Sequence, residues 1–316
     1  MKPPSSSLFP SLLLPLLLTL PVAALAQSIY IWTDENGITH FTDRQPVTDR
    51  EVTVQKAIAE PNSLLDIRQT GPDDDPQWWF HNRSQGPLAV RISLAEEDNV
   101  VSSPELPEIF VLPAGAEREL VTIGPLDPKR SWRYRLQTQS MPGDPTGQHR
   151  PDRPYRPPFA PGASFTIGQA FGGQHSHNTP SSQYAVDIAM PIGTPVHAAR
   201  EGVVMDLARW FHRSGSELER YGNRANYVRI LHDDGSMAVY AHLDYNGVRV
   251  REGQQVRRGQ LIGKSGNTGF SSGPHLHFAI QLNRDLKLVS VPFEFEGPDG
   301  RVLSPREGLS LGAPGG

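Results

Sequence analysis

QYAVDIAMP at residues 183–191, SMAVYAHLD at residues 236–244 and PHLHFAIQ at residues 274–281 are the segments that determine the fold of this chain. In each segment larger apolar side chains alternate with small or ionisable ones, and this period of two is typical of a β-strand with two unlike faces. Side chains two positions apart in a strand share a face and lie roughly 6.6 Å apart along it. The three segments therefore predict three strands, each with polar residues on one face.

The ionisable residues of these strands are expected to lie together. Asp187 has only alanines beside it on its face, His242 shares a face with Tyr240, and His275 shares a face with His277. A lone histidine in a strand usually has a structural role, and a lone aspartate in an apolar run is costly to bury unless it is paired or bound to a metal. Several such groups in three strands favour a shared metal ion at the floor of a groove. Because His275 and His277 lie roughly 6.6 Å apart along the strand, one metal ion cannot easily bind both imidazoles. One of them is therefore expected to bind the metal and the other to act as an acid or base.

The composition excludes several other classes of function. The 316 residues include 30 Lys and Arg against 34 Asp and Glu, a formal net charge of −4, so no basic excess is available to neutralise nucleic-acid phosphates. The absence of cysteine rules out a cysteine nucleophile, a thiolate metal site, disulfides and lipid attachment through a thiol. The segment GQLIGKS at residues 259–265 has three residues between its glycines, whereas a phosphate-binding P-loop needs four.

The N-terminus has the features of a secretory signal peptide over residues 1–26. Lys2 supplies a positive charge, residues 12–20 are apolar, and Ala-Leu-Ala at residues 24–26 forms a small-x-small cleavage site before Gln27. The apolar run is shorter than the ~20 residues that a transmembrane helix needs. We therefore expect an exported protein, periplasmic in a Gram-negative bacterium, with no membrane span after signal removal.

The remaining chain is expected to contain three β-rich parts. Residues 27–60 include IYIWTDENGITHFTDR, a hairpin pattern that resembles a small module of unknown function in exported bacterial proteins. Residues 66–140 carry short strand patterns spaced as in a small β-sandwich. Seven of the 22 residues at 141–162 are proline, which predicts a semi-rigid extended linker. Residues 163–296 form the domain with the ionisable strands, and residues 297–316 are expected to be a tail that is poorly ordered at its end.

Three longer segments of the third part follow one another in a characteristic order. They are YAVDIAMPIGTPVHAAREGVV, ANYVRILHDDGSMAVYAHL and VRRGQLIGKSGNTGFSSGPHLHF, and the pattern covers most of residues 165–281. This pattern resembles the LytM/lysostaphin-like family of zinc metallopeptidases. The resemblance implies an all-β chain with an antiparallel β-sheet peptidase domain and a narrow groove. By the same resemblance, Asp187 and His277 match zinc ligands, and His242 and His275 match the catalytic histidines.

The third ligand of the implied zinc site stands at a less usual position. The commonest family spacing has a histidine four residues before the aspartate, but that position is Gln183 in this chain. The sequence resembles instead a branch in which Ser-His stands further upstream, which makes His177 the third ligand and His175 its rival. His177 is preferred because it lies in the Ser-His pair and nearer to Asp187. The longer gap does not refute the site, since lengthening a loop costs little closure entropy.

Two histidine nitrogens and one carboxylate oxygen around one zinc ion per chain, with a position left for water, are typical of a catalytic zinc site. The resemblance implies an endopeptidase that cleaves peptide bonds in peptidoglycan cross-links or stem peptides. The sequence does not identify a regulatory partner. His242 or His275 would take a proton from water and return one to the leaving amine. The other histidine, or Tyr240, would hydrogen-bond the developing oxyanion. Two alternatives remain: a catalytically inactive LytM-fold regulator that activates other cell-wall hydrolases, and a non-haem iron site formed by two histidines and one carboxylate. Residues 206–225 interrupt two strands and are expected to form a helical flap beside the groove.

Overall fold

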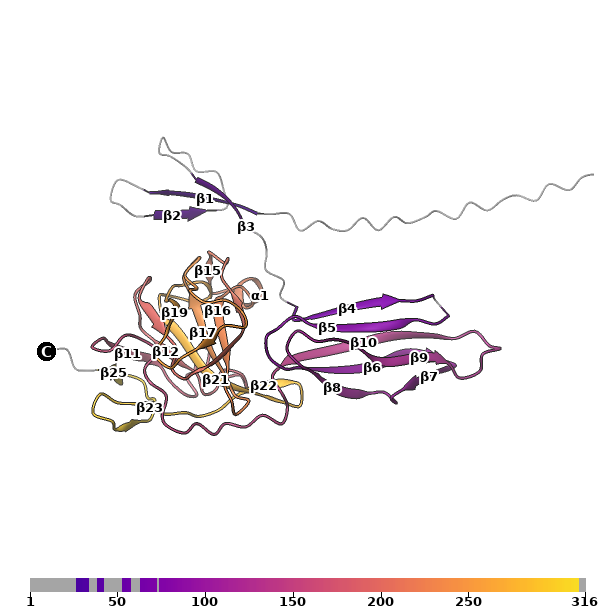
Figure 1. Ribbon diagram of the computed structural model, residues 1–316. Helices are drawn as coiled ribbons and strands as arrows, with labels where there is room; N and C mark the ends of the chain where they lie inside the picture. The colour runs from indigo at the N-terminus through magenta and orange to yellow at the C-terminus, as the bar shows by residue number, and fades with distance from the viewer. Residues whose placement is uncertain (1–26, 34–38, 43–52, 58–62, 73, 313–316) are drawn as a thin grey trace, which may run out of the picture. The chain divides into compact units, whose positions relative to one another are not determined.

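The computed structural model describes most of the chain from the first predicted strand onward (Figure 1). The described residues are 27–33, 39–42, 53–57, 63–72 and 74–312. The chain forms two compact units, Met1–Ala59 and Glu60–Gly316. The predicted signal peptide, residues 1–26, lies outside the described residues.

The first unit contains a three-stranded antiparallel sheet. β1 (Gln27–Thr33) pairs with β2 (Thr39–Thr42) on one side and with β3 (Thr53–Ala57) on the other. The pairing of β1 with β2 confirms the predicted hairpin. The sequence analysis does not predict β3, because its sequence TVQKA is short and has little alternation.

The second unit begins with a β-sandwich, as predicted. One sheet has the order β4-β5-β9-β7 and the other has the order β10-β6-β8. The strands are β4 (Leu65–Thr70), β5 (Gln77–Asn82), β6 (Leu88–Asp98), β7 (Val100–Ser103), β8 (Glu108–Leu112), β9 (Glu117–Pro125) and β10 (Arg133–Pro142). Phe80 and Val121 of the first sheet and Val90 of the second belong to one buried apolar cluster. The two sheets therefore pack face to face, which is the arrangement of a sandwich.

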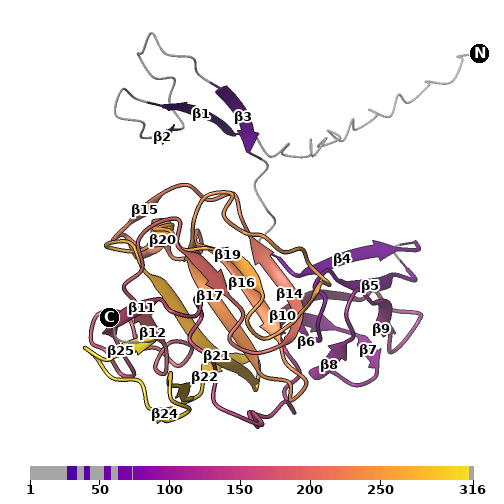
Figure 2. The same ribbon diagram turned by 60° about the vertical axis from the view of Figure 1, so that its left-hand side comes forward.

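The C-terminal domain is built on a nine-stranded sheet in which all neighbouring strands are antiparallel (Figure 2). Its order is β18-β14-β16-β17-β21-β12-β11-β25, and β22 also pairs with β21. The strands are β11 (Ser164–Gln169), β12 (Val186–Ile188), β14 (Gly202–Ala208), β16 (Asn226–Leu231), β17 (Met237–Leu243), β18 (Gln255–Val256), β21 (Leu276–Arg284), β22 (Lys287–Ser290) and β25 (Ser310–Gly312). The three segments that the sequence analysis starts from thus lie next to one another, with β21 between β17 and β12.

Short two-stranded ribbons and one helical turn complete this domain. The ribbons pair β13 (Pro195–His197) with β19 (Leu261–Lys264), β15 (Ser214–Gly215) with β20 (Gly269–Phe270), and β23 (Phe295–Glu296) with β24 (Val302–Leu303). The predicted helical flap at residues 206–225 is reduced to the single turn α1 (Leu218–Tyr221). Within the part of the chain that the structure describes, no helix has the length and apolar character to cross a membrane.

One face of the large sheet carries the apolar core of the domain. Tyr240 of β17 and Phe278 of β21 are fully buried and directly opposite each other in the strand pairing. Phe293 and Phe295, which follow β22, pack their rings edge-on or tilted against Phe278 at centroid distances of 5.1 and 5.8 Å. Burial of aromatic side chains of this size dominates core energetics, so the opposite face of the sheet is free to carry polar groups.

The proline-rich segment at residues 141–162 is part of this core, which corrects the prediction of an extended linker. Tyr155 is 1% exposed and Phe159 is 2% exposed. The Tyr155 ring meets Phe293 and Phe278, and its backbone N–H donates to the Glu294 carbonyl at 2.9 Å. The segment contains turns and bends as well as prolines, and proline density alone does not show that aromatic residues between the prolines pack on a neighbouring sheet.

The predicted C-terminal tail is also ordered over most of its length. β24 lies within residues 297–312, and β25 adds a strand to the edge of the large sheet beside β11. Leu311 is fully buried in the core cluster. The Gly and Pro content of this segment reflects turns between short strands, and the end of the predicted tail, residues 313–316, lies outside the described residues.

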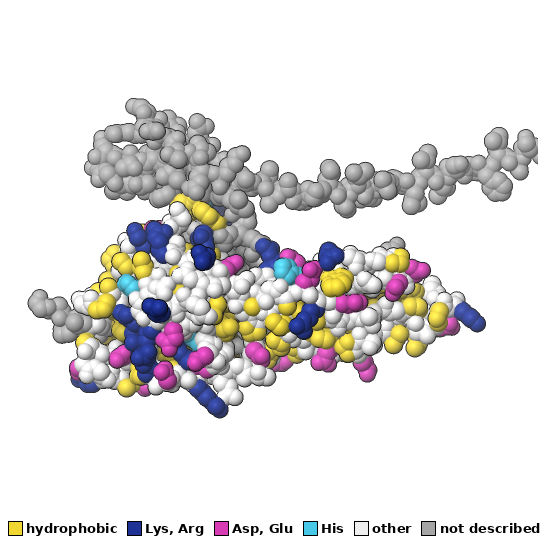
Figure 3. Space-filling model, in the orientation of Figure 1, with side chains coloured by type: hydrophobic (Ala, Val, Ile, Leu, Met, Phe, Trp, Pro, Cys, Tyr) yellow, Lys and Arg dark blue, Asp and Glu magenta, His cyan; other side chains and the backbone are white. Residues whose placement is uncertain are grey.

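The charges on the second unit are mixed in sign. In the face that Figure 3 shows, Lys and Arg side chains are interspersed with Asp and Glu side chains. Many of them pair across elements, as Arg68 does with Glu117 at 2.9 Å and Arg91 with Asp285 at 3.1 Å. This distribution agrees with the small net charge of −4.

Replacing Tyr155 tests whether the proline-rich segment contributes to the core. We expect Tyr155→Ala to lower the free energy of unfolding by about 3–5 kcal/mol, the range for a large aromatic truncated in a core. Urea denaturation followed by tryptophan fluorescence measures this change. Arg153→Ala, whose side chain is 54% exposed, is the matched control and should change little. A loss below about 1 kcal/mol for Tyr155→Ala would be the behaviour of a spacer.

A second prediction concerns stability against acid. His232 is 3% exposed, its Nδ1 donates to the Glu201 carbonyl at 2.6 Å, and burial lowers its pKa to about 4. An unfolded histidine has a pKa of about 6.5, so between these pH values the unfolded state binds more protons. The free energy of unfolding of the metal-free protein should therefore fall as the pH falls from about 6.5 towards 4.

The variant His232→Asn, whose amide can donate in place of Nδ1, isolates this contribution. We expect its pH slope between 6.5 and 4 to be flatter than that of the wild type by up to about 1.4 kcal/mol per pH unit, the value for one proton. Urea titrations at a series of pH values give both slopes. Identical slopes would show that His232 does not remain neutral in the folded state.

Candidate metal centre

Strand pairing places Asp187 beside His277. In the antiparallel ladder between β12 and β21, Asp187 is directly opposite His277, and in the ladder between β17 and β21 His277 is opposite Ala241. Directly opposed side chains lie on the same face of a sheet. His277 Nδ1 is 2.9 Å from Asp187 Oδ1, and the small Ala241 leaves space on the other side. These two groups therefore form a pair on the polar face of the sheet.

His177 reaches the same carboxylate from outside the sheet. It lies in the turns between β11 and β12 and is fully buried. Its Nδ1 donates to the Ala170 carbonyl at 2.8 Å, which leaves a lone pair on Nε2. Nε2 is 3.2 Å from Asp187 Oδ1. The ligand atoms of His177, Asp187 and His277 all lie within 4.8 Å of one another.

This donor set fits a metal ion. An unprotonated ring nitrogen that faces a carboxylate oxygen at 3.2 Å places two lone pairs against each other. His177 Nε2 also makes no hydrogen bond to the described part of the chain. A cation between the two atoms removes this conflict, and nitrogen and oxygen ligands of zinc at 2.0–2.2 Å lie about 3.3 Å apart in a tetrahedron. Burial, nitrogen and oxygen donors and their spacing all agree with such an ion.

The electrostatics of the group point the same way. Although burial opposes ionisation, hydrogen bonds from the protonated forms of His177 and His277 and the charges of the nearby rings hold the pKa of Asp187 well below its usual range. Burial disfavours the imidazolium form of His177, but the Asp187 carboxylate, through a hydrogen bond to that form and through its charge, raises the pKa of this ring. Both shifts show that the site favours a positive charge next to Asp187.

His242 enters the groove through a strained backbone. Strict alternation along β17 places it on the core face with Tyr240, but its φ of 60° lies in the left-handed region and turns the side chain to the other face. Its Nδ1 donates to the Thr268 carbonyl at 2.7 Å. Burial, together with His275 and His277, lowers the pKa of His242 to about 3, so the ring is neutral at pH 7.

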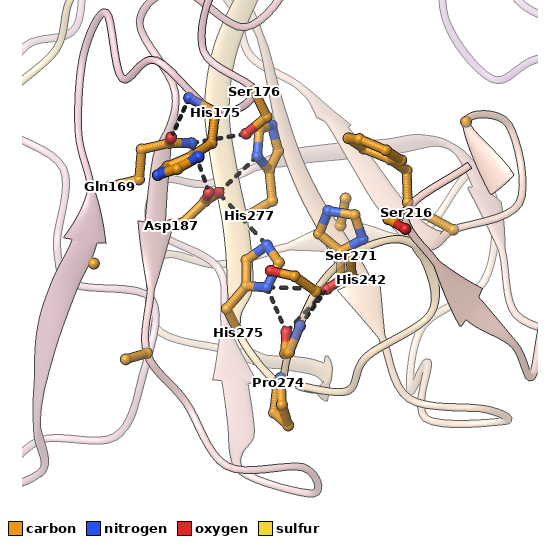
Figure 4. A pocket seen from close by; sticks show the side chains of 18 of the residues that line it. Gln169, His175, Ser176, Asp187, Ser216, His242, Ser271, Pro274, His275 and His277 are labelled. Carbon is orange, nitrogen blue, oxygen red and sulfur yellow. Dashed lines mark hydrogen bonds and ion pairs between the residues drawn. The ribbon is translucent and has the colours of Figure 1, made fainter. Parts of the chain in front are cut away.

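His275 lies next to His242 and close to the carboxylate. The two ring centroids are 4.6 Å apart, and His275 Nε2 is 3.6 Å from Asp187 Oδ1. His275 Nδ1 donates to the Gly273 carbonyl at 2.8 Å. Since both rings donate through Nδ1, each retains a lone pair on Nε2 that can accept a proton. Figure 4 shows both rings close to the Asp187 group.

Asp187, His242, His275 and His277 line an open groove of about 700 Å³, whereas His177 is fully buried and is not one of the lining residues. Its floor includes Ala189, Val239 and Ala241, and one side is formed by the loop from Ser271 to Pro274 (Figure 4). Leu218 of α1 and Phe270 also line the groove. The predicted flap thus borders the groove, although only as one helical turn.

Two of the candidate residues lie elsewhere than their proposed roles require. Tyr240 is fully buried on the core face, where its hydroxyl accepts a hydrogen bond from the Ala199 N–H at 2.7 Å. Tyr240 therefore cannot contact a substrate in the groove, and the prediction of an oxyanion contact is wrong. His175, the rival ligand, lines the groove with an exposed side chain, and it is not part of the three-residue group.

Sequence reasoning missed several polar residues around the site. Gln169 contacts Asp187, Thr268 positions the ring of His242, and Ser271 lies 3.3 Å from His275 Nδ1. No periodicity distinguishes these residues from other polar residues in turns and at strand ends. Their contacts join residues far apart in the sequence, and only the folded chain shows them.

Comparison with known proteins covers both units. Residues 181–287 match the model of Peptidase family M23, and residues 16–63 match that of a domain of unknown function, DUF4124. The peptidoglycan DD-endopeptidase ShyA of Vibrio cholerae is 45% identical over 94 residues, which cover 30% of this chain and 19% of ShyA. Lysostaphin of Staphylococcus simulans is 39% identical over 101 residues, which cover 32% of this chain and 18% of lysostaphin. The chain thus spans about a fifth of the length of these relatives.

Solved structures similar to the chain come from the same group of proteins. A mutant catalytic domain of the prophage-encoded M23 protein EnpA from Enterococcus faecalis is 26% identical, with a TM-score of 0.31, covering 43% of this chain and 93% of that one. Lysostaphin from Staphylococcus simulans is 32% identical, with a TM-score of 0.28, covering 38% of this chain and 43% of that one.

The all-β fold, a His-Asp-His group that could hold a metal ion and the sequence match all agree with the class of M23 peptidase domains. More closely, the C-terminal domain is a Peptidase family M23 domain, which confirms the resemblance drawn from the sequence.

The strained conformation of His242 rests on a buried network that can be tested. Thr268 Oγ1 donates to the Leu243 carbonyl at 2.8 Å and accepts the Asn226 N–H at 3.0 Å. Thr268→Val keeps the shape but removes both hydrogen bonds. We expect the free energy of unfolding to fall by about 1–3 kcal/mol, the cost of buried polar groups without partners. Thr268→Ser, which retains the hydroxyl, should lose less. No loss in Thr268→Val, measured in urea, would show that the hydrogen bonds of the Thr268 hydroxyl do not stabilise the fold.

Proposed function

We propose that this chain is an exported zinc metalloendopeptidase that hydrolyses peptide bonds in the cross-links or stem peptides of peptidoglycan. The observation that carries the proposal is the group of His177, Asp187 and His277 on the floor of an open groove, with the His242 and His275 rings beside it. The relatives named peptidoglycan DD-endopeptidase and lysostaphin support the choice of substrate. The signal-like N-terminus supports export.

Three residues would hold the zinc ion. Nε2 of His177, Oδ1 of Asp187 and Nδ1 of His277 are the atoms that face one another. When bound, zinc supplies Lewis-acid activation of water and polarisation of a carbonyl oxygen. The Ala170 carbonyl fixes the tautomer of His177, as a hydrogen-bond acceptor behind a metal-binding histidine commonly does.

His242 and His275 would carry the protons of the reaction. Each ring is anchored by a backbone carbonyl at Nδ1 and retains a lone pair on Nε2. Through this lone pair either ring would accept a proton from water and later deliver one to the leaving amine. The ring that is protonated at a given moment can also hydrogen-bond the oxygen that gains negative charge. With Tyr240 buried in the core, this second role falls to the histidines.

The groove fits a narrow, extended peptide. Its floor is built from small side chains, Ala189 and Ala241, and from Val239. Among the lining residues that the structure describes there is no Lys or Arg. A backbone with small side chains can therefore approach the site closely, and short peptide bridges of cell walls have this character.

Digestion of purified peptidoglycan tests the proposal. The zinc-loaded mature chain should release new amino termini, detected by mass spectrometry of the products, and a chelator should abolish the release. His242→Ala and His275→Ala should each lower turnover by at least roughly 100-fold, the scale of general acid-base catalysis, while the bound zinc measured by elemental analysis stays near one per chain.

Substitution of the proposed ligands should separate binding from proton transfer. Asp187→Ala and His277→Ala should lose both zinc and cleavage, and His177→Ala should behave in the same way. His175→Ala is the matched control and should keep both. A wild-type chain that retains no zinc and cuts no bond, yet stimulates another cell-wall hydrolase, would favour the regulator instead.

A further inference from the structure

Gln169 is a buried polar residue behind the metal group. It ends β11, is 8% exposed, and lines the groove beside Asp187 (Figure 4). Its Nε2 donates to Asp187 Oδ2 at 3.1 Å and to Ser176 Oγ at 2.7 Å, and its Oε1 accepts the His175 N–H at 3.1 Å. Both amide hydrogens and the carbonyl oxygen are therefore used.

The contact with Asp187 distinguishes the two carboxylate oxygens. Gln169 binds Oδ2, whereas His177 Nε2 and His277 Nδ1 face Oδ1 at 3.2 and 2.9 Å. A carboxylate held at one oxygen by an amide donor can no longer rotate freely about its Cβ–Cγ bond. Oδ1 therefore remains directed at the two imidazoles, which is the orientation that a single-oxygen ligand needs.

The other two contacts fix the segment that carries His177. This residue stands ten positions before Asp187, in turns outside the sheet, so no strand pairing sets its position. Gln169 instead binds the two residues immediately before it, through the backbone of His175 and the hydroxyl of Ser176.

The turn is shaped around the Gln169 side chain. A Cβ atom at Gly173 would lie 2.2 Å from Gln169 Cγ, so only glycine allows the turn to come this close. The Gly173 carbonyl in turn accepts the His177 N–H at 3.0 Å. The glutamine, the glycine and the buried histidine thus form one packed unit.

We propose that Gln169 is a positioning residue of the metal centre: it selects Oδ1 of Asp187 as the ligand atom and sets the turn that delivers His177. A short spacing between histidine and aspartate would by itself hold the two ligands close together. In this chain the Gln169 side chain holds them in position instead. The inference rests on the proposed function only in that the ion bound by this group is zinc.

Zinc affinity of the full mature chain is the test, with Gln169→Met as the main variant. Methionine retains the volume and removes all three hydrogen bonds. We expect the zinc Kd, measured by competition with a chromophoric chelator, to rise by roughly 10–100-fold, the scale for loss of a group that orients a metal ligand. The visible absorption of the Co²⁺-substituted protein should also change, because the ligand geometry changes. A purely structural residue would lower stability without altering the spectrum of the folded, loaded protein.

Two further variants keep the test decisive. Gln174→Met makes the same substitution at an exposed residue of the same turn and should leave the Kd and the spectrum unchanged. Gln169→Leu also removes the donor to Oδ2 and adds no charge beside the carboxylate, so it should weaken zinc as Gln169→Met does. It replaces the methionine variant if that protein does not fold.

The outcomes separate this inference from the proposed function. A Kd within twofold of the wild type and an unchanged Co²⁺ spectrum in the Gln169 variants would overturn the positioning role, even if the wild type cleaves peptidoglycan. Weakened zinc binding in a set of proteins that cleave nothing would support the positioning role and contradict the peptidase. A wild type that binds no zinc would overturn both.

Discussion

The site depends on one carboxylate held among imidazole rings. Oδ1 of Asp187 lies within 3.6 Å of ring nitrogens of His177, His275 and His277. Such a group is costly to keep in a partly closed groove unless a positive charge balances it. The surrounding structure brings these residues together from three sources: the pairing of β12 with β21, the turns after β11, and the loop that precedes β21. Each of them is fixed by contacts outside the site, so the fold itself holds these residues together.

The two faces of the large sheet have opposite tasks. The core face buries Tyr240, Phe278 and the rings that pack on them, and this packing keeps the sheet rigid. The groove face carries alanine, valine and histidine, which leave room for a ligand. His242 crosses from the first face to the second through its left-handed conformation, and Thr268 and Asn226 hold that conformation in place. Strain of this kind is found where the surrounding structure over-determines a residue at a functional site.

The domain is larger than its catalytic motifs. The proline-rich segment before β11 contributes Tyr155 and Phe159 to the core, and the C-terminal segment contributes Leu311 on an added edge strand. The sandwich is joined to the same domain by backbone hydrogen bonds, such as that from the Gln85 N–H to the Met205 carbonyl at 2.8 Å. The segments that look like linker and tail in the sequence therefore support the sheet on which the metal group lies.

The sequence by itself indicated the three strands and the polar faces of β12 and β21, because period-two alternation is a local property of each segment. The family resemblance supplied the proposed ligands Asp187 and His277 and limited the third to His175 or His177, of which His177 has its nitrogen close to the other two residues. Only the tertiary structure decided that Tyr240 lies in the core while His242 turns into the groove, that Tyr155 belongs to the core, and that an amide contacts the Asp187 carboxylate. These features arise from the φ angle of His242 and from contacts between residues distant in the chain. Neither produces a periodic pattern in the sequence.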